Sequence, residues 1–170
     1  MITSIAVFTA HYLSPVGRLR ISVSENAVHE LLFADEPESD LIQPTPSVSI
    51  EFMEVVVQQL DEYFTGRRKK FDLPLSQAGT AFQQRVWEEL AQIPYGATIS
   101  YLELSRRLGN IKAIRAAAST NGKNRIAIVV PCHRVIGSDQ QLVGYAGGLS
   151  KKKWLLEHEL KFAHGKQTLF

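Results

Sequence analysis

The stretch IAIVVPCHRVI, residues 126–136, joins an apolar run to a cysteine–histidine pair. The apolar run predicts a buried strand that ends at Pro131, which would place Cys132 at a rigid position beside the basic residue His133. A thiol held in this way suits a nucleophile. Free cysteines are also among the most buried residue types, so a packed core thiol is the alternative at Cys132.

The composition limits the class of protein. A chain of 170 residues is long enough for one ample domain or two small ones, and its charged and hydrophobic fractions are those of an ordinary globular protein. A single cysteine excludes an internal disulfide and a cysteine-rich zinc site, and it fits a reducing cytoplasm. No run is apolar enough to span a membrane, and residues 1–8 lack the basic lead-in of a signal peptide. We therefore expect a cytoplasmic protein without a membrane partner.

Charge divides the chain into two regions. Two basic residues stand against ten acidic ones through Gly66, whereas seventeen basic residues stand against seven acidic ones from Arg67 onward. Such asymmetry indicates two domains, of which the second suits a polyanion such as nucleic acid. A solvated basic face is the alternative, but here the basic half also contains the candidate nucleophile.

The first region predicts a small antiparallel sheet followed by a helix. Strands are expected over residues 5–12, 18–24 and 28–33, and helical spacing of apolar residues extends from Ile50 to Phe64 with Gly66 as the stop. An acidic, proline-containing loop at residues 35–46 separates the third strand from the helix, and a further short strand is expected at residues 71–73. Linker chemistry at residues 75–79 places the boundary between domains 1–76 and 77–170.

The second region begins with capped helices. TAFQ at residues 80–83 predicts a capping box, and SYLE at residues 100–103 predicts a second one at the start of a helix that ends near Gly109. A further helix is expected over residues 112–119, so that two short helices surround a glycine-containing turn, as in a helix-turn-helix unit. Its small residues and cations are typical of a face that approaches a nucleic-acid groove. A last helix, capped by Ser150, contains Trp154 and Glu159.

In this order and spacing, the motifs resemble those of the O(6)-alkylguanine-DNA alkyltransferases, also called methylated-DNA–protein-cysteine methyltransferases. The resemblance covers essentially the whole chain and rests on PCHRV at residues 131–135, the helix-turn-helix with Tyr101 and Arg115, the Asn124 turn, GYAGG at residues 144–148 and WLLEHE at residues 154–159. It implies an α+β fold of two domains. The first would be a ribonuclease-H-like α/β domain, and the second a mostly helical domain with a winged helix-turn-helix.

The resemblance also implies a reaction and roles for individual residues. The protein would repair duplex DNA by removing alkyl groups from the O6 position of guanine, with Cys132 as the acceptor. His133 would activate the thiol through a water, Glu159 would orient His133, and Asn124 would shape the turn that leads to the thiol. Tyr101 would donate a proton or hydrogen bond to the leaving guanine.

Further residues would hold the DNA and the flipped base. Arg115 resembles the side chain that enters the base stack in place of the extruded nucleotide, as base flipping requires. The other DNA contacts are expected from Tyr101, Lys112, Ala113, Ala116, Lys123 and Arg125, and the base contacts from Tyr101, Val135, Ser138, Tyr145 and Ala146. Arg125 replaces a proline that is usual after the asparagine, and Ile114 replaces a residue that is often small, and the sequence does not decide what either departure changes.

The thioether product has no evident means of cleavage, so we expect one turnover per molecule, without a cofactor or a metal, from a monomer. Whether O4-alkylthymine is accepted as well is not decided by the sequence. One alternative is a non-catalytic sensor of alkylated DNA, but relatives of that kind lack the cysteine that is present here as Cys132. A cysteine hydrolase with a Cys-His-Glu triad is the other, and it would leave the helix-turn-helix unexplained.

Overall fold

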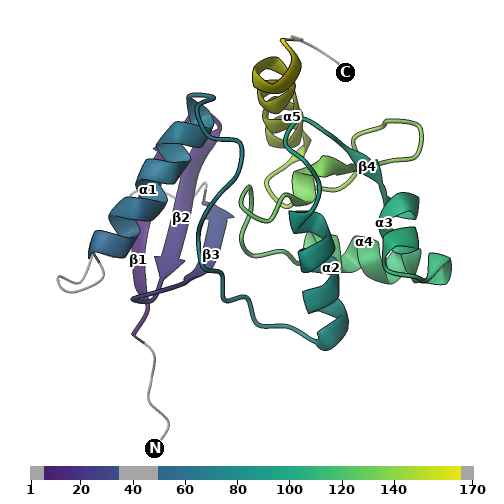
Figure 1. Cartoon of the computed structure of the whole chain (residues 1–170), viewed down its shortest axis with the longest axis horizontal. Helices are drawn as coiled ribbons and strands as arrows, with labels where there is room; N and C mark the ends of the chain where they lie inside the picture. The colour runs from purple at the N-terminus through teal and green to yellow at the C-terminus, as the bar shows by residue number, and fades with distance from the viewer. Residues whose placement is uncertain (1–5, 35–49, 166–170) are drawn as a thin grey trace, which may run out of the picture. The chain divides into compact units, whose positions relative to one another are not determined.

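Residues 6–34 and 50–165 are described by the computed structural model, in which the chain forms two compact units, Met1–Gln77 and Ala78–Phe170. The first unit contains a three-stranded sheet and one helix, and the second is mainly helical (Figure 1). This confirms the predicted α+β class. The acidic loop expected at residues 35–46 lies outside the described residues.

The sheet of the first unit is antiparallel and has the order β1-β2-β3. Its strands are β1 (Phe8–Ser14), β2 (Gly17–Val23) and β3 (Val28–Phe33). The alternation expected on the second strand is confirmed, because Leu19, Ile21 and Val23 are fully buried. The first strand begins and ends later than predicted, since pairing with β2 continues as far as Ser14 opposite Gly17.

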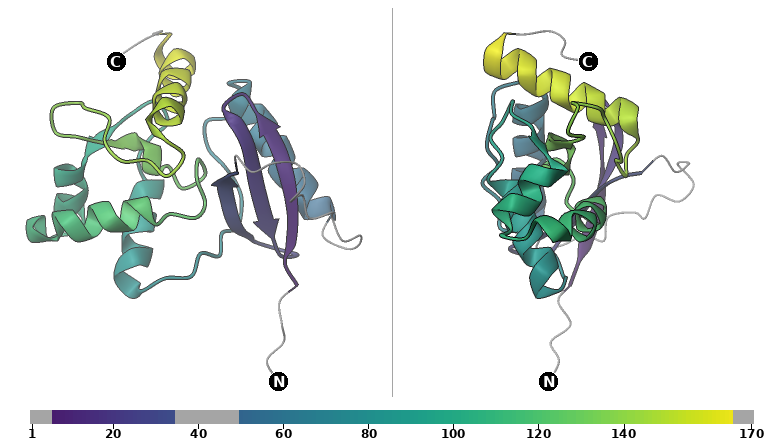
Figure 2. Two further views of the ribbon diagram at one scale, coloured as in Figure 1. Left: turned by 180° about the vertical axis from the view of Figure 1, so that it is seen from behind. Right: turned by 90° about the vertical axis from the view of Figure 1, so that its right-hand side faces the viewer.

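Helix α1 (Ile50–Phe64) lies along one face of this sheet (Figure 2). It buries Val56, Leu60 and Tyr63, and the hydroxyl of Tyr12 on β1 donates a 2.6 Å hydrogen bond to Oδ1 of Asp61. Gly66, with φ of 77°, follows the helix in the left-handed conformation that the predicted stop required.

The strand predicted at residues 71–73 is wrong. Only Leu75 forms a bridge, an isolated parallel one with Val28. The Gln59 side chain explains the difference, because its Oε1 accepts a hydrogen bond from the N–H of Asp72 and its Nε2 donates to the carbonyl oxygen of Asp72, both at 2.9 Å. The backbone groups that would pair in a strand are therefore used by a side chain of α1.

In the second unit, helices α2 (Ala81–Ala91), α3 (Tyr101–Arg107) and α4 (Ile114–Gly122) contact one another. The capping box of Thr80 and Gln83 is confirmed in both directions. At α3 only the serine half of the predicted box forms, since Ser100 accepts from the N–H of Glu103 while the Glu103 carboxylate pairs with Arg107.

The helix-turn-helix unit is formed by α3 and α4. Gly109, with φ of 78°, ends the first helix, and the Asn110 side chain caps a short 3-10 helix, Ile111–Ala113, that leads into α4. The single helix predicted over residues 112–119 is thus a 3-10 turn followed by an α-helix that continues to Gly122.

A two-stranded parallel pair brings distant segments together beside these helices. Strand β4 (Ile99–Ser100) directly precedes α3, and it pairs with β5 (Val135–Ile136), which directly follows the Pro-Cys-His segment. The last helix, α5 (Leu149–His164), begins after Gly148. The prediction that Ser150 caps it is wrong, because Gly148 occupies the cap position and Ser150 lies inside the first turn.

Candidate active site and DNA-binding surface

The apolar residues 126–130 form a compact turn, so the strand predicted there is wrong. The cause is Asn124, whose Nδ2 donates to the carbonyl oxygens of Val130 at 2.8 Å and Ile126 at 3.3 Å, while its Oδ1 accepts from the N–H of Ile126 at 3.1 Å. These bonds fold the chain back on itself, and Ile128 adopts φ of 71°, which is rare for a β-branched residue. Asn124 therefore shapes the turn that delivers the thiol.

Cys132 is the first residue of a 3-10 helix, Cys132–Arg134, that continues into β5. Its thiol is free and its residue surface is 6% exposed. Pairing of β5 with β4 brings this helix toward the start of α3, where Tyr101 is the first residue. Two predicted site residues that are far apart in the sequence thus share one region of the second unit.

The surroundings of Cys132 have opposite effects on the pKa of its thiol. Burial raises the pKa of the thiol, whereas a hydrogen bond from the Asn124 side chain and the positive charge of Lys152 lower it. Backbone N–H groups of Cys132 and His133 act in the same direction as Asn124 and Lys152. Burial is the largest of these effects, so the pKa of the thiol is raised on balance, and Asn124 has a second role beside shaping the turn because it offsets part of that rise.

His133 and Glu159 form a fully buried pair. Nε2 of His133 lies 2.7 Å from Oε1 of Glu159. Arg134 binds the same carboxylate in a fork, from Nε to Oε2 at 2.8 Å and from its NH2 group to Oε1 at 2.9 Å. The backbone N–H of Gly96 donates to Oε2 at 3.3 Å. Three separate residues thus donate hydrogen bonds to the carboxylate of Glu159.

These contacts decide the protonation of the pair. Burial acts to raise the pKa of Glu159, but hydrogen bonds and charge from His133 and Arg134 outweigh it and hold the pKa well below 4.5. Burial lowers the pKa of His133, and the cations Arg134 and Lys152 add to that effect against Glu159. Because an ionised carboxylate only accepts, Nε2 of the neutral ring carries the hydrogen and Nδ1 is left as an acceptor.

Nδ1 of His133 is buried and has no hydrogen-bond partner within residues 6–34 and 50–165. A neutral imidazole nitrogen with a free lone pair is a proton acceptor. His133 can therefore take a proton in the region next to Cys132, and Glu159 can stabilise the imidazolium that results.

Tyr101 and the glycine-rich segment border the same region. The Tyr101 hydroxyl donates to the carbonyl oxygen of Val143 at 3.3 Å, and burial followed by the nearby Cys132 charge raises the pKa of Tyr101. Burial likewise raises the pKa of Tyr145 well above 10.0, with Cys132 as the next cause. Both phenols therefore stay protonated near the thiol and can donate hydrogen bonds.

The remaining predicted substrate-binding residues differ in burial. Val135 is buried at the start of β5, and Ala146 is exposed two residues beyond Gly144. Ser138 lies in the exposed turn after β5. The structure therefore places Val135 directly after the Cys132–Arg134 helix and Ser138 on the surface three residues further along the chain.

Most of the predicted DNA-binding residues are exposed on α4 or directly beside it. In α4, Ala117, Thr120 and Asn121 are buried. Helical periodicity turns the opposite side of this helix outward, and the predicted contact residues Lys112, Arg115, Ala116, Lys123 and Arg125 are exposed, with Ala113 half-buried. The carbonyl oxygen of Thr120 accepts a 3.2 Å hydrogen bond from Nε1 of Trp87, which fixes α4 to α2. Lys112, Arg115, Lys123 and Arg125 thus present exposed positive charge on or beside a helix that is anchored to α2.

The sequence analysis missed three residues that the structure places in the site around Cys132 and the His133–Glu159 pair. Arg134 holds Glu159, Lys152 is fully buried, and Nδ2 of Asn121 lies 3.4 Å from the carbonyl oxygen of Cys132. A signal for Lys152 was present, because it precedes the apolar Leu155 and Leu156 by three and four positions and so shares the buried face of α5. Arg134 gave no comparable periodic signal.

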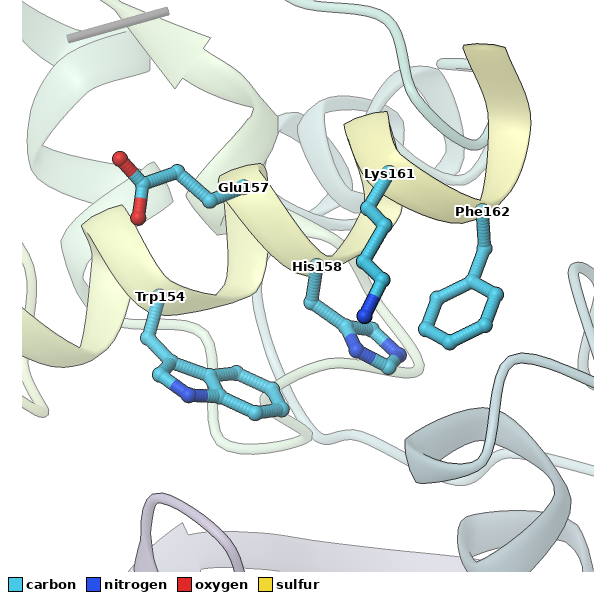
Figure 3. A pocket seen from close by; sticks show the side chains of 5 residues that line it. All are labelled: Trp154, Glu157, His158, Lys161 and Phe162. Atoms are coloured by element: carbon cyan, nitrogen blue, oxygen red, sulfur yellow. The ribbon is translucent and has the colours of Figure 1, made fainter. Parts of the chain in front are cut away.

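A cavity of about 370 Å³ lies along α5 (Figure 3). It is lined by Trp154, Glu157, His158, Lys161 and Phe162. The indole of Trp154 stacks on the His158 ring with centroids 4.8 Å apart. Across the described ranges of the chain, no group of three or more histidine, cysteine or acidic residues is arranged to hold a metal ion. The same ranges contain no helix with the length and apolar character needed to cross a bilayer.

Both units match domains of one family. Residues 7–77 match the 6-O-methylguanine DNA methyltransferase ribonuclease-like domain, and residues 81–161 match the DNA binding domain of the same family. A constitutive methylated-DNA–protein-cysteine methyltransferase of Bacillus subtilis is 42% identical over 146 residues, which cover 84% of this chain and 88% of that protein. The corresponding protein of Mycobacterium tuberculosis is 42% identical over 160 residues, covering 92% of this chain and 94% of that one.

Solved structures agree with these matches. The crystal structure of Mycobacterium tuberculosis O6-methylguanine methyltransferase is 40% identical, has a TM-score of 0.81 and covers 95% of this chain and 97% of its own. A structure of the Mycobacterium tuberculosis protein in complex with DNA has a TM-score of 0.79 at 40% identity, over 89% of this chain and 92% of its own.

Proposed function

This chain belongs to the 6-O-methylguanine DNA methyltransferase family, and we propose that its single cysteine, Cys132, is the residue that accepts the alkyl group. The protein is a methylated-DNA–protein-cysteine methyltransferase, which binds DNA and repairs it by alkyl transfer to a cysteine. The observation that supports the assignment is the free, buried thiol of Cys132 directly before the His133–Glu159 pair.

The reaction follows from the protonation states in the site. His133 takes the thiol proton at Nδ1 through a bridging water, and the imidazolium is stabilised by Glu159 at 2.7 Å. The thiolate of Cys132 then forms a sulfur–carbon bond with the alkyl group while the bond between that carbon and the guanine O6 breaks. Tyr101, whose phenol stays protonated, donates a hydrogen bond or proton to the leaving guanine. The unmodified base and an S-alkylcysteine are the products.

The base must leave the duplex to reach a thiol that is 6% exposed. Arg115 on the exposed side of α4 would fill the gap in the stack, and Lys112, Lys123 and Arg125 would bind phosphates. Backbone groups of Val135 and Ala146 would read the edge of the flipped guanine, beside Tyr145. The substrate is therefore duplex DNA that contains O6-alkylguanine.

Each molecule reacts once, because a thioether is stable and the site supplies no group that would cleave it. We infer that the protein acts as a monomer, without cofactor or metal, in a reducing compartment such as the cytoplasm, since the reaction needs the free thiol of Cys132.

Intact-protein mass spectrometry after incubation with a duplex containing O6-methylguanine, followed by peptide mapping, tests the proposal. The expected result is a single added methyl on Cys132, with modified protein and repaired base in equal amounts. A Cys132→Ala variant should retain DNA binding and lose repair. Repair that persists in this variant, or a methyl group found on another residue, would overturn the assignment. An unmodified wild-type protein that still retains the duplex would instead indicate a sensor of alkylated DNA.

A further inference from the structure

Lys152 is the middle of three consecutive lysines on α5, and its side chain is turned into the second unit. Its residue surface is 0% exposed, whereas Lys153 is exposed and forms a surface pair with Glu157 at 3.8 Å. Lysine is almost never fully buried unless its charge has partners. The partners of the buried ammonium therefore decide what Lys152 can do.

The Lys152 ammonium donates hydrogen bonds to three backbone carbonyl oxygens. Nζ donates to Val135 at 2.7 Å, to Val143 at 2.9 Å and to Gly144 at 3.2 Å. An ammonium group has three N–H donors, so all three are used. A neutral apolar side chain of similar length cannot donate to these carbonyls, and it would leave the buried carbonyl of Val135 without the Lys152 donor, which is costly.

These carbonyls belong to two segments that both follow the reacting thiol in the chain. Val135 begins β5 immediately after the Cys132–Arg134 helix, while Val143 and Gly144 begin the segment that leads to Tyr145 and Ala146. The carbonyl oxygen of Val143 also accepts a 3.3 Å hydrogen bond from the hydroxyl of Tyr101. Lys152 therefore ties β5 to the segment 143–146 at a point that Tyr101 also contacts.

We propose that Lys152 is a positioning residue for the substrate base, which holds segment 143–146 against β5 so that the flipped guanine is presented to Cys132. This rests on the proposed roles of Val135 and Ala146 in reading the base. The positive charge of Lys152 also acts on the thiol, since it lowers the pKa of Cys132, and burial lowers the pKa of Lys152 itself to about 8. A test must therefore separate positioning of the base from activation of the thiol.

Two reactions of the Cys132 thiol distinguish positioning of the base from activation of the thiol. Iodoacetamide needs only the thiolate of Cys132, whereas free O6-benzylguanine must also be held by the base-binding segment. Rate constants for both reactions are measured by intact-protein mass spectrometry in the wild type, in Lys152→Met and in the exposed control Lys153→Met. The wild type is first incubated with the O6-methylguanine duplex, and if Cys132 is not methylated the proposed function itself fails, before any variant is compared.

In Lys152→Met, the rate with O6-benzylguanine should fall at least about tenfold more than the rate with iodoacetamide, because a buried charge-assisted hydrogen-bond network is lost. Lys153→Met should match the wild type in both reactions. Equal losses in both reactions of Lys152→Met would show an effect on the thiol alone and would overturn the positioning role, as would no loss in either reaction. An equal change in Lys153→Met would overturn it too.

If Lys152→Met does not unfold cooperatively on heating, Lys152→Arg takes its place. The planar guanidinium keeps the charge but cannot direct three N–H groups from one nitrogen at three carbonyls. In Lys152→Arg, the rate with O6-benzylguanine divided by the rate with iodoacetamide should still be lower than in the wild type. A ratio equal to that of the wild type would show that charge alone suffices, which contradicts positioning by the three hydrogen bonds.

Discussion

Nδ2 of Asn124 lies 2.8 Å from the carbonyl oxygen of Val130, and this hydrogen bond closes a turn only two residues before Cys132. The same side chain accepts the N–H of Ile126 at 3.1 Å, so one buried amide supplies both a donor and an acceptor to the backbone. The turn contains Ile128 at φ of 71°, a conformation that costs energy for a β-branched residue. Asn124 stabilises that strained path, and it also lowers the pKa of the thiol.

Replacement of Asn124 by Ala should therefore destabilise the second unit and slow alkyl transfer. We expect a loss of at least about 2 kcal/mol in the free energy of unfolding, measured with urea, because buried backbone groups lose their partners. The matched control is Asn110→Ala, which removes one exposed hydrogen bond to the N–H of Lys112 and should cost about 1 kcal/mol. Equal losses in the two variants would contradict the role of the Asn124 turn.

Glu159→Gln should make the free energy of unfolding depend less on pH in the acidic range. The folded-state pKa of Glu159 is lowered below 4.5, so its stabilising effect is complete above pH 4.5 and is lost as the pH falls toward the folded-state value. At pH 7 the variant should be less stable by about 3–5 kcal/mol, because Arg134 loses the anion that it binds at 2.8 Å. Urea unfolding from pH 7 to pH 3 measures both effects. A difference between wild type and variant that stays constant below pH 4.5 would rule out this linkage.

Arg115→Ala should slow repair of duplex DNA far more than reaction with free O6-benzylguanine, because only the duplex requires a side chain to replace the flipped nucleotide. The two rates are compared by the formation of S-alkylated Cys132. The control is Arg20→Ala, which removes a cation from the first unit and should leave both rates unchanged. Equal losses on both substrates in Arg115→Ala would remove the role of Arg115 in flipping.

DNA binding should weaken steeply with salt, because exposed lysines of the second unit replace counterions on phosphates. The logarithm of the association constant, measured by fluorescence anisotropy, should fall linearly with the logarithm of the salt concentration. Lys112→Ala and Lys123→Ala should each reduce the slope by about 1, whereas Lys69→Ala, an exposed residue of the first unit, should not change it. A flat salt response in the wild type would argue against this surface as the DNA-binding face.

Periodic patterns and local motifs predicted much of the fold. Leu19, Ile21 and Val23 lie on a buried strand face, as their alternation indicates, and the capping box of Thr80 and Gln83 forms because both partners lie within one turn of backbone. The two wrong strand predictions share a cause. At residues 71–73 and 126–130, the side chains of Gln59 and Asn124 bind backbone groups that would otherwise pair in strands. Hydrophobicity alone does not record such competition.

The sequence by itself determined the chemistry that is available: a single thiol, the histidine beside it, a glutamate on the last helix and a cationic half of the chain. Only the tertiary structure decided how these groups act on one another. It brings both Arg134 and His133 within hydrogen-bond distance of Glu159. It also buries the ammonium of Lys152, which donates to carbonyl oxygens instead of to water. The reason is physical, because a pKa or a hydrogen-bond partner depends on burial and on distances across space, and residues far apart in the chain set both.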